Sequence, residues 1–195
     1  MIPAWNEQQC LPRLLDSVQS ARAQYGGGAD AIEVIVADNA STDATARIAR
    51  ERGCRVAPVS KRCIAASRNA GARLATGRIL AFADADFRIH PQTFRVIADL
   101  MGRRGIIGGG TGVTLERWSA GIELTWMMIV PPMWLIGFDG GVWFCRRSDF
   151  QEVGGFDESV RAGEDVLFLT ALWRLGRSRR PPEKLATRFT ARSTT

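Results

Sequence analysis

Two acidic residues, Asp84 and Asp86, follow an apolar run at 79–83. A short apolar run predicts a buried strand, and residues two apart on an extended segment point the same way. Their carboxylates would then lie at the carboxyl edge of a sheet, where open α/β folds bind ligands. Oxygen ligands at this edge could hold Mg²⁺ or Mn²⁺ together with a diphosphate, although a solvated loop or a helix cap is the other interpretation of such a pair.

Other charged residues are candidates for the same site. Asp38 directly follows four apolar residues, which places it at the same predicted edge; a helix cap is the alternative, and Ser41 fits that role better. Glu164 and Asp165 open an amphipathic segment, and acids in a first helical turn often only complement the helix dipole. Arg68 could contact a nucleotide or pair with a surface acid.

The elements that must position these residues can be predicted from the apolar pattern. Short apolar runs alternate with amphipathic segments, which is typical of a mostly parallel sheet covered by helices. The pattern predicts helices over about 7–22, 42–52, 64–75 and 91–101 and strands over 32–37, 55–58 and 79–83. A last helix begins at Glu164, and its expected apolar face consists of Val166, Leu167, Leu169, Thr170, Leu172 and Trp173.

The composition is that of one globular unit. The chain has 195 residues, of which 46% are apolar, enough for one α/β domain with a sizeable core. Its net charge of +6 comes from residues 174–195, which carry seven basic residues and one acid. These basic residues suit a solvated helix end, an anionic lipid surface or a diphosphate. The sequence lacks the aromatic-interleaved basic face expected of a nucleic-acid-binding protein.

The cysteine and histidine pattern excludes the usual zinc sites. Cys10, Cys54, Cys63 and Cys145 show no CxxC spacing, and His90 is the only histidine. Reduced thiols, together with the lack of a visible signal peptide, predict a cytoplasmic protein.

The apolar segment 122–138 contains Glu123 and the pair Pro131-Pro132, so it is not predicted to cross a membrane. The Trp and Met residues of 118–143 suit either a core or an exposed lip for a lipid tail or a sugar. Together with the basic carboxyl-terminal residues, such a lip predicts the inner face of the membrane as one location for the protein.

Several short motifs occur in series along the chain. They are Pro3-Ala4-Trp5-Asn6-Glu7, Val34 to Asp43, Ala66 to Ala72, Leu80 to Phe87, and Gly154 to Glu158 followed by Gly163-Glu164-Asp165. In this order and at these separations they resemble the family 2 glycosyltransferases, whose catalytic domain has the GT-A fold. The resemblance covers about nine-tenths of the chain. It implies a GT-A type, Rossmann-like α/β fold with a mostly parallel sheet flanked by helices.

The resemblance also implies a nucleotide-sugar site built on these motifs. Asp86 would be the direct ligand of Mg²⁺ or Mn²⁺, and Asp84 would assist the metal while lying nearer the ribose. Asp38 would hydrogen-bond the nucleobase, and Asp165 would be the base that deprotonates the acceptor hydroxyl. The remaining matched positions would line the nucleotide sugar: Pro3, Ala4, Glu7, Arg68 and Ala85, with Asp84.

The function implied is that of an inverting, metal-dependent glycosyltransferase. Such an enzyme moves a sugar from a nucleotide-diphosphate donor to an acceptor hydroxyl, with lipid-linked and cell-envelope glycans among the acceptors. The alternative is a catalytically silent nucleotide-sugar binding module. Within a single domain over 1–195, residues 1 to about 90 would bind the nucleotide and residues from about 91 to 195 would bind the acceptor.

Two features depart from the family pattern. The family has an apolar strand before the Pro-Ala-x-Asn-Glu turn, and only Met1 and Ile2 precede that turn here, so the first strand is predicted to be truncated. Loss of a central strand would leave backbone groups of its neighbours unpaired, as expected of a fragment or a misplaced start. At 38–41 the sequence reads Asp-Asn-Ala-Ser, where the family often has Asp-Asp-Gly-Ser.

Overall fold

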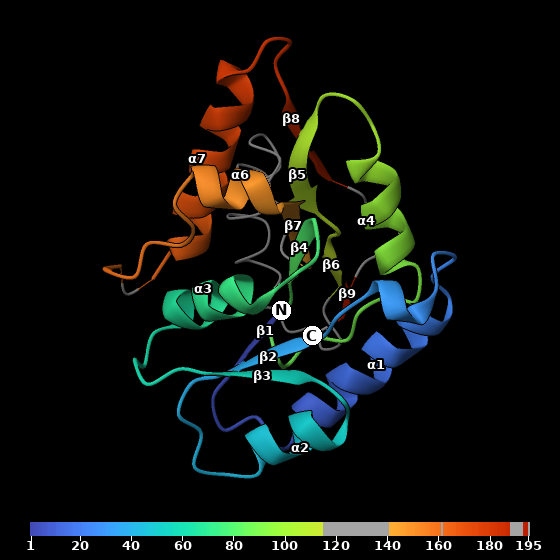
Figure 1. Cartoon of the computed structure of the whole chain (residues 1–195), viewed down its shortest axis with the longest axis vertical. Coiled ribbons are helices and arrows are strands. Elements are labelled where there is room, and N and C mark those ends of the chain that lie inside the picture. Colours follow the sequence, from blue (N-terminus) through green and yellow to red (C-terminus); the bar gives the residue numbers. More distant parts are fainter. Residues whose placement is uncertain (115–140, 161, 188–192, 195) are drawn as a thin grey trace, which may run out of the picture.

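The computed structural model describes residues 1–114, 141–160, 162–187 and 193–194 (Figure 1). Most of the Trp- and Met-rich segment at 118–143, which the sequence predicts to be either core or an exposed lip for a lipid tail or a sugar, lies outside the described residues. None of the helices in the described ranges is long and apolar enough to cross a membrane.

The first half of the chain forms a parallel three-stranded sheet in the order β1-β2-β3. Its strands are β1 (Ile2–Ala4), β2 (Ile35–Asp38) and β3 (Arg55–Pro58). The helices between and after them are α1 (Leu11–Ala23), the short 3-10 helix η1 (Ala29–Ala31), α2 (Thr45–Glu51) and α3 (Ile64–Leu74). Each strand is therefore followed by a helix, as the alternating apolar pattern predicts.

The rest of the chain forms a four-stranded sheet in the order β4-β7-β5-β8, in which β7 runs antiparallel to both neighbours. Its strands are β4 (Ile79–Phe82), β5 (Ile106–Gly110), β7 (Trp143–Arg146) and β8 (Lys184–Thr187). The strands β6 (Val113–Thr114) and β9 (Ser193–Thr194) form a separate parallel pair. The helices of this part are α4 (Thr93–Met101), α6 (Arg147–Glu152) and α7 (Glu164–Ser178).

Met1 joins the two sheets. Its ammonium donates to the Ala81 carbonyl at 2.6 Å, and the Ala83 N–H donates to the Met1 carbonyl at 3.1 Å. β1 therefore lies between β2 and β4 at the centre of the molecule. The strand is short, but it is not limited to the first two residues as predicted, because Pro3 and Ala4, which were expected in the turn, complete it.

Helices cover both faces of this sheet (Figure 1). One apolar cluster packs α1 and α4 against one face, and a second packs α3, α6 and α7 against the other. In the second cluster the Phe82 ring lies 5.1 Å from Phe156 and 5.6 Å from Phe150 between centroids. The predicted apolar face of α7 is partly wrong, because the helix buries Phe168, Leu169 and Leu172 and leaves Val166, Leu167 and Trp173 exposed.

Candidate functional site

The predicted acidic residues meet at the carboxyl ends of β1, β2 and β4. Glu7 follows β1, Asp38 is the last residue of β2, and Asp84 and Asp86 follow β4. Because β1 lies between β2 and β4, these three strand ends are neighbours. The sheet thus brings together residues that are up to about eighty positions apart in the sequence.

The carboxylates are close enough to influence one another. Burial raises the pKa of Glu7, and the nearby charges of Asp86, Asp43 and Asp84 raise it further. Asp86 as a whole residue is exposed, but partial desolvation of its carboxylate raises its pKa, and the Asp84 carboxylate adds to this effect. A region that concentrates negative charge in this way favours a bound cation.

The donor atoms available here suit Mg²⁺ or Mn²⁺. Among the described residues, no group of three or more His, Cys, Asp or Glu side chains could hold a metal ion by itself. Asp84 and Asp86 offer carboxylate oxygens, which magnesium prefers, and Mg²⁺ commonly takes its other ligands from phosphates and water. The residues therefore fit a metal that binds together with a phosphorylated ligand.

The loops after β1 and β2 hold each other in place. The Asn6 side chain accepts the Thr42 N–H at 2.8 Å, and the Glu7 N–H donates to the Thr45 hydroxyl at 2.8 Å. Asp43 lies one residue before Ala44, the N-cap of α2, and its Oδ1 accepts the Thr45 N–H at 2.9 Å. The predicted cap at Ser41 is wrong, since that hydroxyl instead accepts the Asn6 N–H at 3.0 Å.

Asp38 is half-buried at the end of β2. Its Oδ1 accepts the Ser41 N–H at 3.3 Å, which orients the carboxylate within the loop. Ala40 in this loop has φ +55°, a left-handed conformation that disfavours residues with a Cβ. The alanine thus occupies, with some backbone strain, the position where the family often has glycine.

Pro3, Ala4 and Ala85 are buried beside the charged groups. The Ala4 carbonyl accepts the Asn39 N–H at 2.8 Å, so β1 and the loop after β2 stay paired up to the site. Ala85 separates the two candidate metal ligands, of which Asp84 is half-buried and Asp86 is exposed. These small residues shape the backbone around the carboxylates.

Arg68 is the centre of the charge network at the site. Its Nη2 lies 2.9 Å from Asp84 Oδ1, and its Nη1 lies 2.7 Å from Glu164 Oε1. The guanidinium is only 3% exposed and lies over the Trp143 and Phe156 rings, 4.9 and 5.3 Å from their centroids. Arg68 does pair with acids, but they belong to the site and not to the outer surface.

Glu164 makes a contact at the start of α7 that the sequence did not predict. It is buried, and its contact with Arg68 ties the start of α7 to α3 and to the loop that carries Asp84. Asp165 is half-buried, and its Oδ1 accepts the Val166 N–H at 2.8 Å. Among the described residues no ion pair holds Asp165, so of the two acids it is the one whose carboxylate could accept a proton from a ligand.

Asn69 is a site-building residue that the sequence analysis quoted but did not assign. Its side chain accepts the Phe156 N–H at 2.9 Å and donates to the Phe156 carbonyl at 2.9 Å. It also donates to Glu158 Oε1 at 2.9 Å. Gly155 has φ +75°, and a Cβ there would lie 2.7 Å from the Asn69 Oδ1 atom. The Gly-Gly turn before α7 is therefore fitted to this asparagine.

Comparison with known families identifies the family to which this chain belongs. The model of glycosyl transferase family 2 matches residues 1–153. The match covers more than half of the chain, so the chain belongs to glycosyl transferase family 2. A comparison with curated protein sequences found no match.

Solved structures show the same fold at low sequence identity. S. aureus TarS, residues 1–349, superposes with a TM-score of 0.76 at 17% identity, over 100% of this chain and 58% of that chain. PcManGT, a mannosyltransferase from Pyrobaculum calidifontis in complex with GDP-Man and Mn²⁺, gives a TM-score of 0.77 at 18% identity, over 100% and 55%.

A third similar structure is glucosyl-3-phosphoglycerate synthase from Mycobacterium tuberculosis in complex with Mn²⁺, UDP and phosphoglyceric acid. Its TM-score is 0.65 at 19% identity, over 96% of this chain and 66% of that chain. The chain thus spans 55 to 66% of the length of these three proteins. The likeness confirms the predicted fold class, a mixed α/β fold of the GT-A type with a mostly parallel sheet.

Proposed function

We propose that this chain is the catalytic domain of an inverting, metal-dependent glycosyltransferase. It transfers a sugar from a nucleotide-diphosphate donor to an acceptor hydroxyl, with lipid-linked and cell-envelope glycans as the proposed acceptor class. The observation that carries the proposal is the Arg68 network, because it joins the candidate donor carboxylate Asp84 to the helix that presents the candidate base Asp165.

The donor would bind along the carboxyl ends of β1, β2 and β4. Asp38 would accept a hydrogen bond from the nucleobase, and the backbone around Pro3, Ala4 and Glu7 would line the nucleoside. Arg68 would hold Asp84 oriented toward the ribose, because its Nη2 atom lies 2.9 Å from Asp84 Oδ1. Residues 1 to about 90 would thus form the nucleotide-binding half, and residues from about 91 to 195 the acceptor half.

Asp165 would act on the acceptor. In the proposed reaction its carboxylate takes the proton from the acceptor hydroxyl as the hydroxyl oxygen bonds to the anomeric carbon. The bond from that carbon to the diphosphate breaks, and the diphosphate leaves with the electron pair. Attack from the face opposite the leaving group inverts the configuration at the anomeric carbon.

Asp84 and Asp86 would hold Mg²⁺ or Mn²⁺ at the diphosphate. When bound, the metal neutralises charge on the leaving diphosphate as a Lewis acid. PcManGT and the mycobacterial synthase were solved with Mn²⁺, which supports this choice of cofactor.

Calorimetry of the Asp86→Ala variant tests the metal assignment. We expect this variant to lose most of the Mn²⁺-dependent part of its affinity for a nucleotide diphosphate, because it lacks the direct ligand. Asp99→Asn, on the exposed face of α4, is the control and should bind as the unaltered chain does. Equal affinity of the unaltered chain in chelator and in Mn²⁺ would show that the metal assignment is wrong.

A catalytically silent nucleotide-sugar binding module is the second candidate. The two candidates differ in turnover: a silent module binds the donor without consuming it, whereas a transferase releases the nucleotide diphosphate when acceptor is present.

We also propose that the protein works in the cytoplasm, at the inner face of the membrane. The outer side of α7 supports this, because Val166, Leu167 and Trp173 are exposed there together with Arg174 and Arg177. The Arg177 guanidinium lies 4.9 Å from the centroid of the Trp173 ring. Arg179 is not part of this surface, because its guanidinium pairs with Asp149 at 2.6 Å and Glu183 at 2.7 Å.

Co-sedimentation with vesicles tests the membrane proposal. We expect binding to anionic vesicles at low salt and much weaker binding at high salt, since each basic residue near such a surface contributes about 1 kcal/mol and salt screens it. Trp173→Ser should weaken the binding, and neutral vesicles serve as the control. No binding at low salt would remove the proposal and leave the transferase proposal intact.

A further inference from the structure

A basic hollow opens between the turn that joins α4 to β5 and the segment that joins α7 to β8, near the top of Figure 1. The Lys184 N–H donates to the Gly105 carbonyl at 2.8 Å, so these two segments are held side by side. The volume of the hollow is about 480 Å³, within the usual range of small-ligand pockets. Its charged lining consists of Arg103, Arg104, Arg146, Arg179, Arg180 and Glu183.

The hollow is separate from the candidate site. Because β4 and β5 both run antiparallel to β7, they point the same way, and the hollow lies at the amino end of β5. Arg146, which lines the hollow, is opposite Ile79, the first residue of β4. Asp84 and Asp86 follow the other end of that strand.

Two of the arginines are neutralised by acids. Arg146 pairs with Asp149 at 3.1 Å and with Glu183 at 3.2 Å. Arg179 pairs with the same two acids at 2.6 and 2.7 Å, and with the exposed Glu152 at 3.1 Å. Asp149 is only 1% exposed, so the network is anchored in the interior. These two arginines therefore form a fixed wall of the hollow.

The other three arginines, Arg103, Arg104 and Arg180, are exposed, and no described residue pairs with their guanidinium groups. Basic residues often complement the dipole of a helix in its last turn. That role does not explain these three, because α4 has no basic residue in its last turn and Arg180 follows the end of α7. A hollow lined by charges of one sign concentrates counter-ions, so these three unpaired cations favour an anion.

The chemistry of the lining points to a phosphate group. A guanidinium is a planar fork that can donate two parallel hydrogen bonds to phosphate or carboxylate oxygens. A phosphate monoester carries nearly two negative charges at neutral pH and offers three strong acceptor oxygens, whereas a carboxylate carries one charge. Three unpaired guanidinium groups on two sides of one hollow match the more highly charged group.

We propose that this basic hollow binds the phosphate monoester or diphosphate group of a ligand other than the sugar donor. Arg103 and Arg104 would contact the phosphate from the turn after α4, and Arg180 would contact it from the segment before β8. The phosphate belongs either to a soluble molecule or to a lipid headgroup, and the experiment separates these two sources.

Calorimetry with inorganic pyrophosphate in metal-free buffer tests the site. Without a divalent metal, the acidic side chains of the candidate donor site disfavour a diphosphate there. We expect saturable binding to the unaltered chain and a dissociation constant about tenfold higher in Arg104→Gln and in Arg180→Gln, the loss expected for one hydrogen bond between charged groups.

Arg50→Gln is the matched control, because Arg50 is an exposed arginine on α2 with no ion pair among the described residues. This variant should bind pyrophosphate as the unaltered chain does. All three substitutions change exposed side chains, so the melting temperatures should stay the same and a loss of binding would not reflect unfolding.

Co-sedimentation identifies the source of the phosphate. Phosphatidylcholine vesicles that contain phosphatidic acid, whose headgroup is a phosphate monoester, are compared with vesicles that carry the same charge as phosphatidylserine. A preference for phosphatidic acid that Arg104→Gln abolishes would identify a lipid headgroup. Equal binding to both vesicles, together with pyrophosphate binding, would identify a soluble ligand.

The proposal is overturned if pyrophosphate shows no saturable binding and phosphatidic acid is not preferred. An equal loss of affinity in Arg50→Gln, or unchanged affinity in both Arg104→Gln and Arg180→Gln, would overturn it as well. None of these results bears on the transferase proposal, because the substituted arginines lie away from the candidate site.

Discussion

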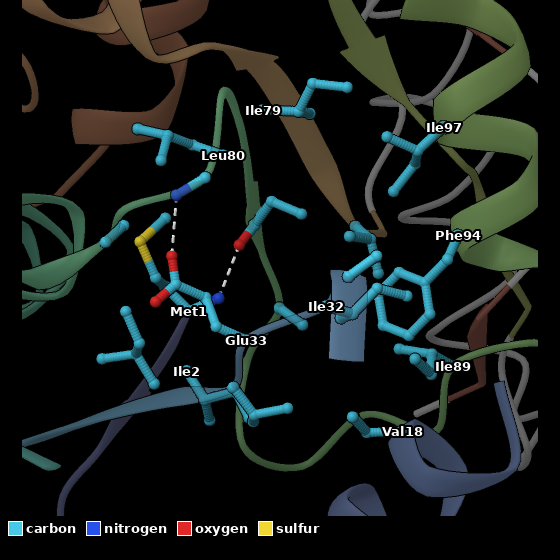
Figure 2. Close-up of a pocket in the computed structure, with 18 of the residues that line it drawn as sticks. Met1, Ile2, Val18, Ile32, Glu33, Ile79, Leu80, Ile89, Phe94 and Ile97 are labelled. Carbon is cyan, nitrogen blue, oxygen red and sulfur yellow. Dashed lines mark hydrogen bonds between the residues drawn. The ribbon is translucent and has the colours of Figure 1, made fainter. Parts of the chain in front are cut away.

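The carboxyl ends and the amino ends of the central strands carry side chains of different chemistry. At their carboxyl ends, Asp38, Asp84 and Asp86 gather around loops whose backbone groups are tied to side chains. At the amino ends of β2 and β4, mostly apolar side chains line a groove (Figure 2), and its charged groups are the buried Met1 amine and Glu33. The carboxyl end concentrates acidic side chains and pairs Asp84 with Arg68, whereas the amino end is lined mainly by apolar side chains.

This difference shows how one sheet separates stability from chemistry. Helices begin just after the carboxyl ends of parallel strands, so polar loops and ligand sites collect there. The amino ends receive the chain from the preceding helix and can be packed with apolar side chains. We therefore expect changes at the carboxyl end to affect binding and turnover, and changes at the amino end to affect folding.

The largest expected effect is on turnover and comes from Asp165→Asn. The change keeps the side-chain shape and removes the proton acceptor, so transfer should fall by roughly 10²–10⁴-fold. Donor affinity, measured by calorimetry with a nucleotide sugar found in a thermal-shift screen, should remain.

Asp99→Asn on α4 is the control for Asp165→Asn and should keep full turnover. A proportional loss of donor affinity and turnover in Asp165→Asn would place the residue in the binding site or the fold. Unchanged turnover would mean that the base lies elsewhere, and an unaltered chain that binds donor without consuming it would favour the silent binding module.

The second effect is on stability at the carboxyl end, from Arg68→Met. This change leaves the buried Glu164 carboxylate without its cation, and breaking a buried ion pair in this way costs about 3–5 kcal/mol. Urea unfolding measures the loss. Adding Glu164→Gln should recover part of it, because the orphaned charge is then gone.

Arg47→Ala is the matched control for Arg68→Met. Arg47 pairs with Glu51 at 2.8 Å on the exposed side of α2, and such surface pairs contribute about 0.5 kcal/mol or less. If Arg68→Met costs no more than Arg47→Ala, the Arg68 network does not hold the site together.

The third effect is a pH dependence at the amino end. The Met1 amine has a pKa of about 6 in the folded chain and 8.0 as its ordinary value, so the unfolded chain binds the proton more tightly. The free energy of unfolding should therefore rise by about 2 kcal/mol between pH 6 and pH 8, out of about 2.7 kcal/mol for the full two-unit shift, and the slope should vanish more than about one pH unit outside that window.

Acetylation of the Met1 nitrogen is the control for the pH slope, because an acetylated nitrogen does not titrate. The groups near the amine titrate elsewhere: hydrogen bonds from Gly77 and Thr76 outweigh burial and lower the pKa of Glu33, and burial raises the pKa of Cys54 above 9.0. An equal slope in the acetylated protein would mean that another group causes it.

The local pattern of apolar residues predicted much of the fold and the boundaries of some helices and strands. The strand at 55–58 agrees with β3, and the helix expected over 64–75 agrees with α3. β5 was not predicted because it contains Gly108, Gly109 and Gly110, which disfavour a strand. These glycines allow close packing: a Cβ on Gly108 would lie 2.5 Å from the Phe144 carbonyl oxygen, and one on Gly109 would collide with Ala186.

The candidate site was predicted less completely than the fold. The acids at strand ends could be found from the apolar runs before them, and the structure brings Glu7, Asp84 and Asp86 together. The partners of Arg68 could not be found, because Glu164 is 96 positions away and no local spacing relates the two. The same is true of Asn69 and Phe156, which meet only when α3 packs beside the turn before α7.

Asn69 acts as a template for the turn that precedes α7, and this has an evolutionary consequence. Its side-chain amide hydrogen-bonds to both the N–H and the carbonyl of Phe156. Its Oδ1 atom also leaves no room for a side chain at position 155. A mutation at either position therefore changes which residues are acceptable at the other. We expect that, in a library randomised at positions 69 and 155 and selected for folded protein, the residues at the two positions depend on each other. Clones that keep asparagine at 69 should have glycine at 155.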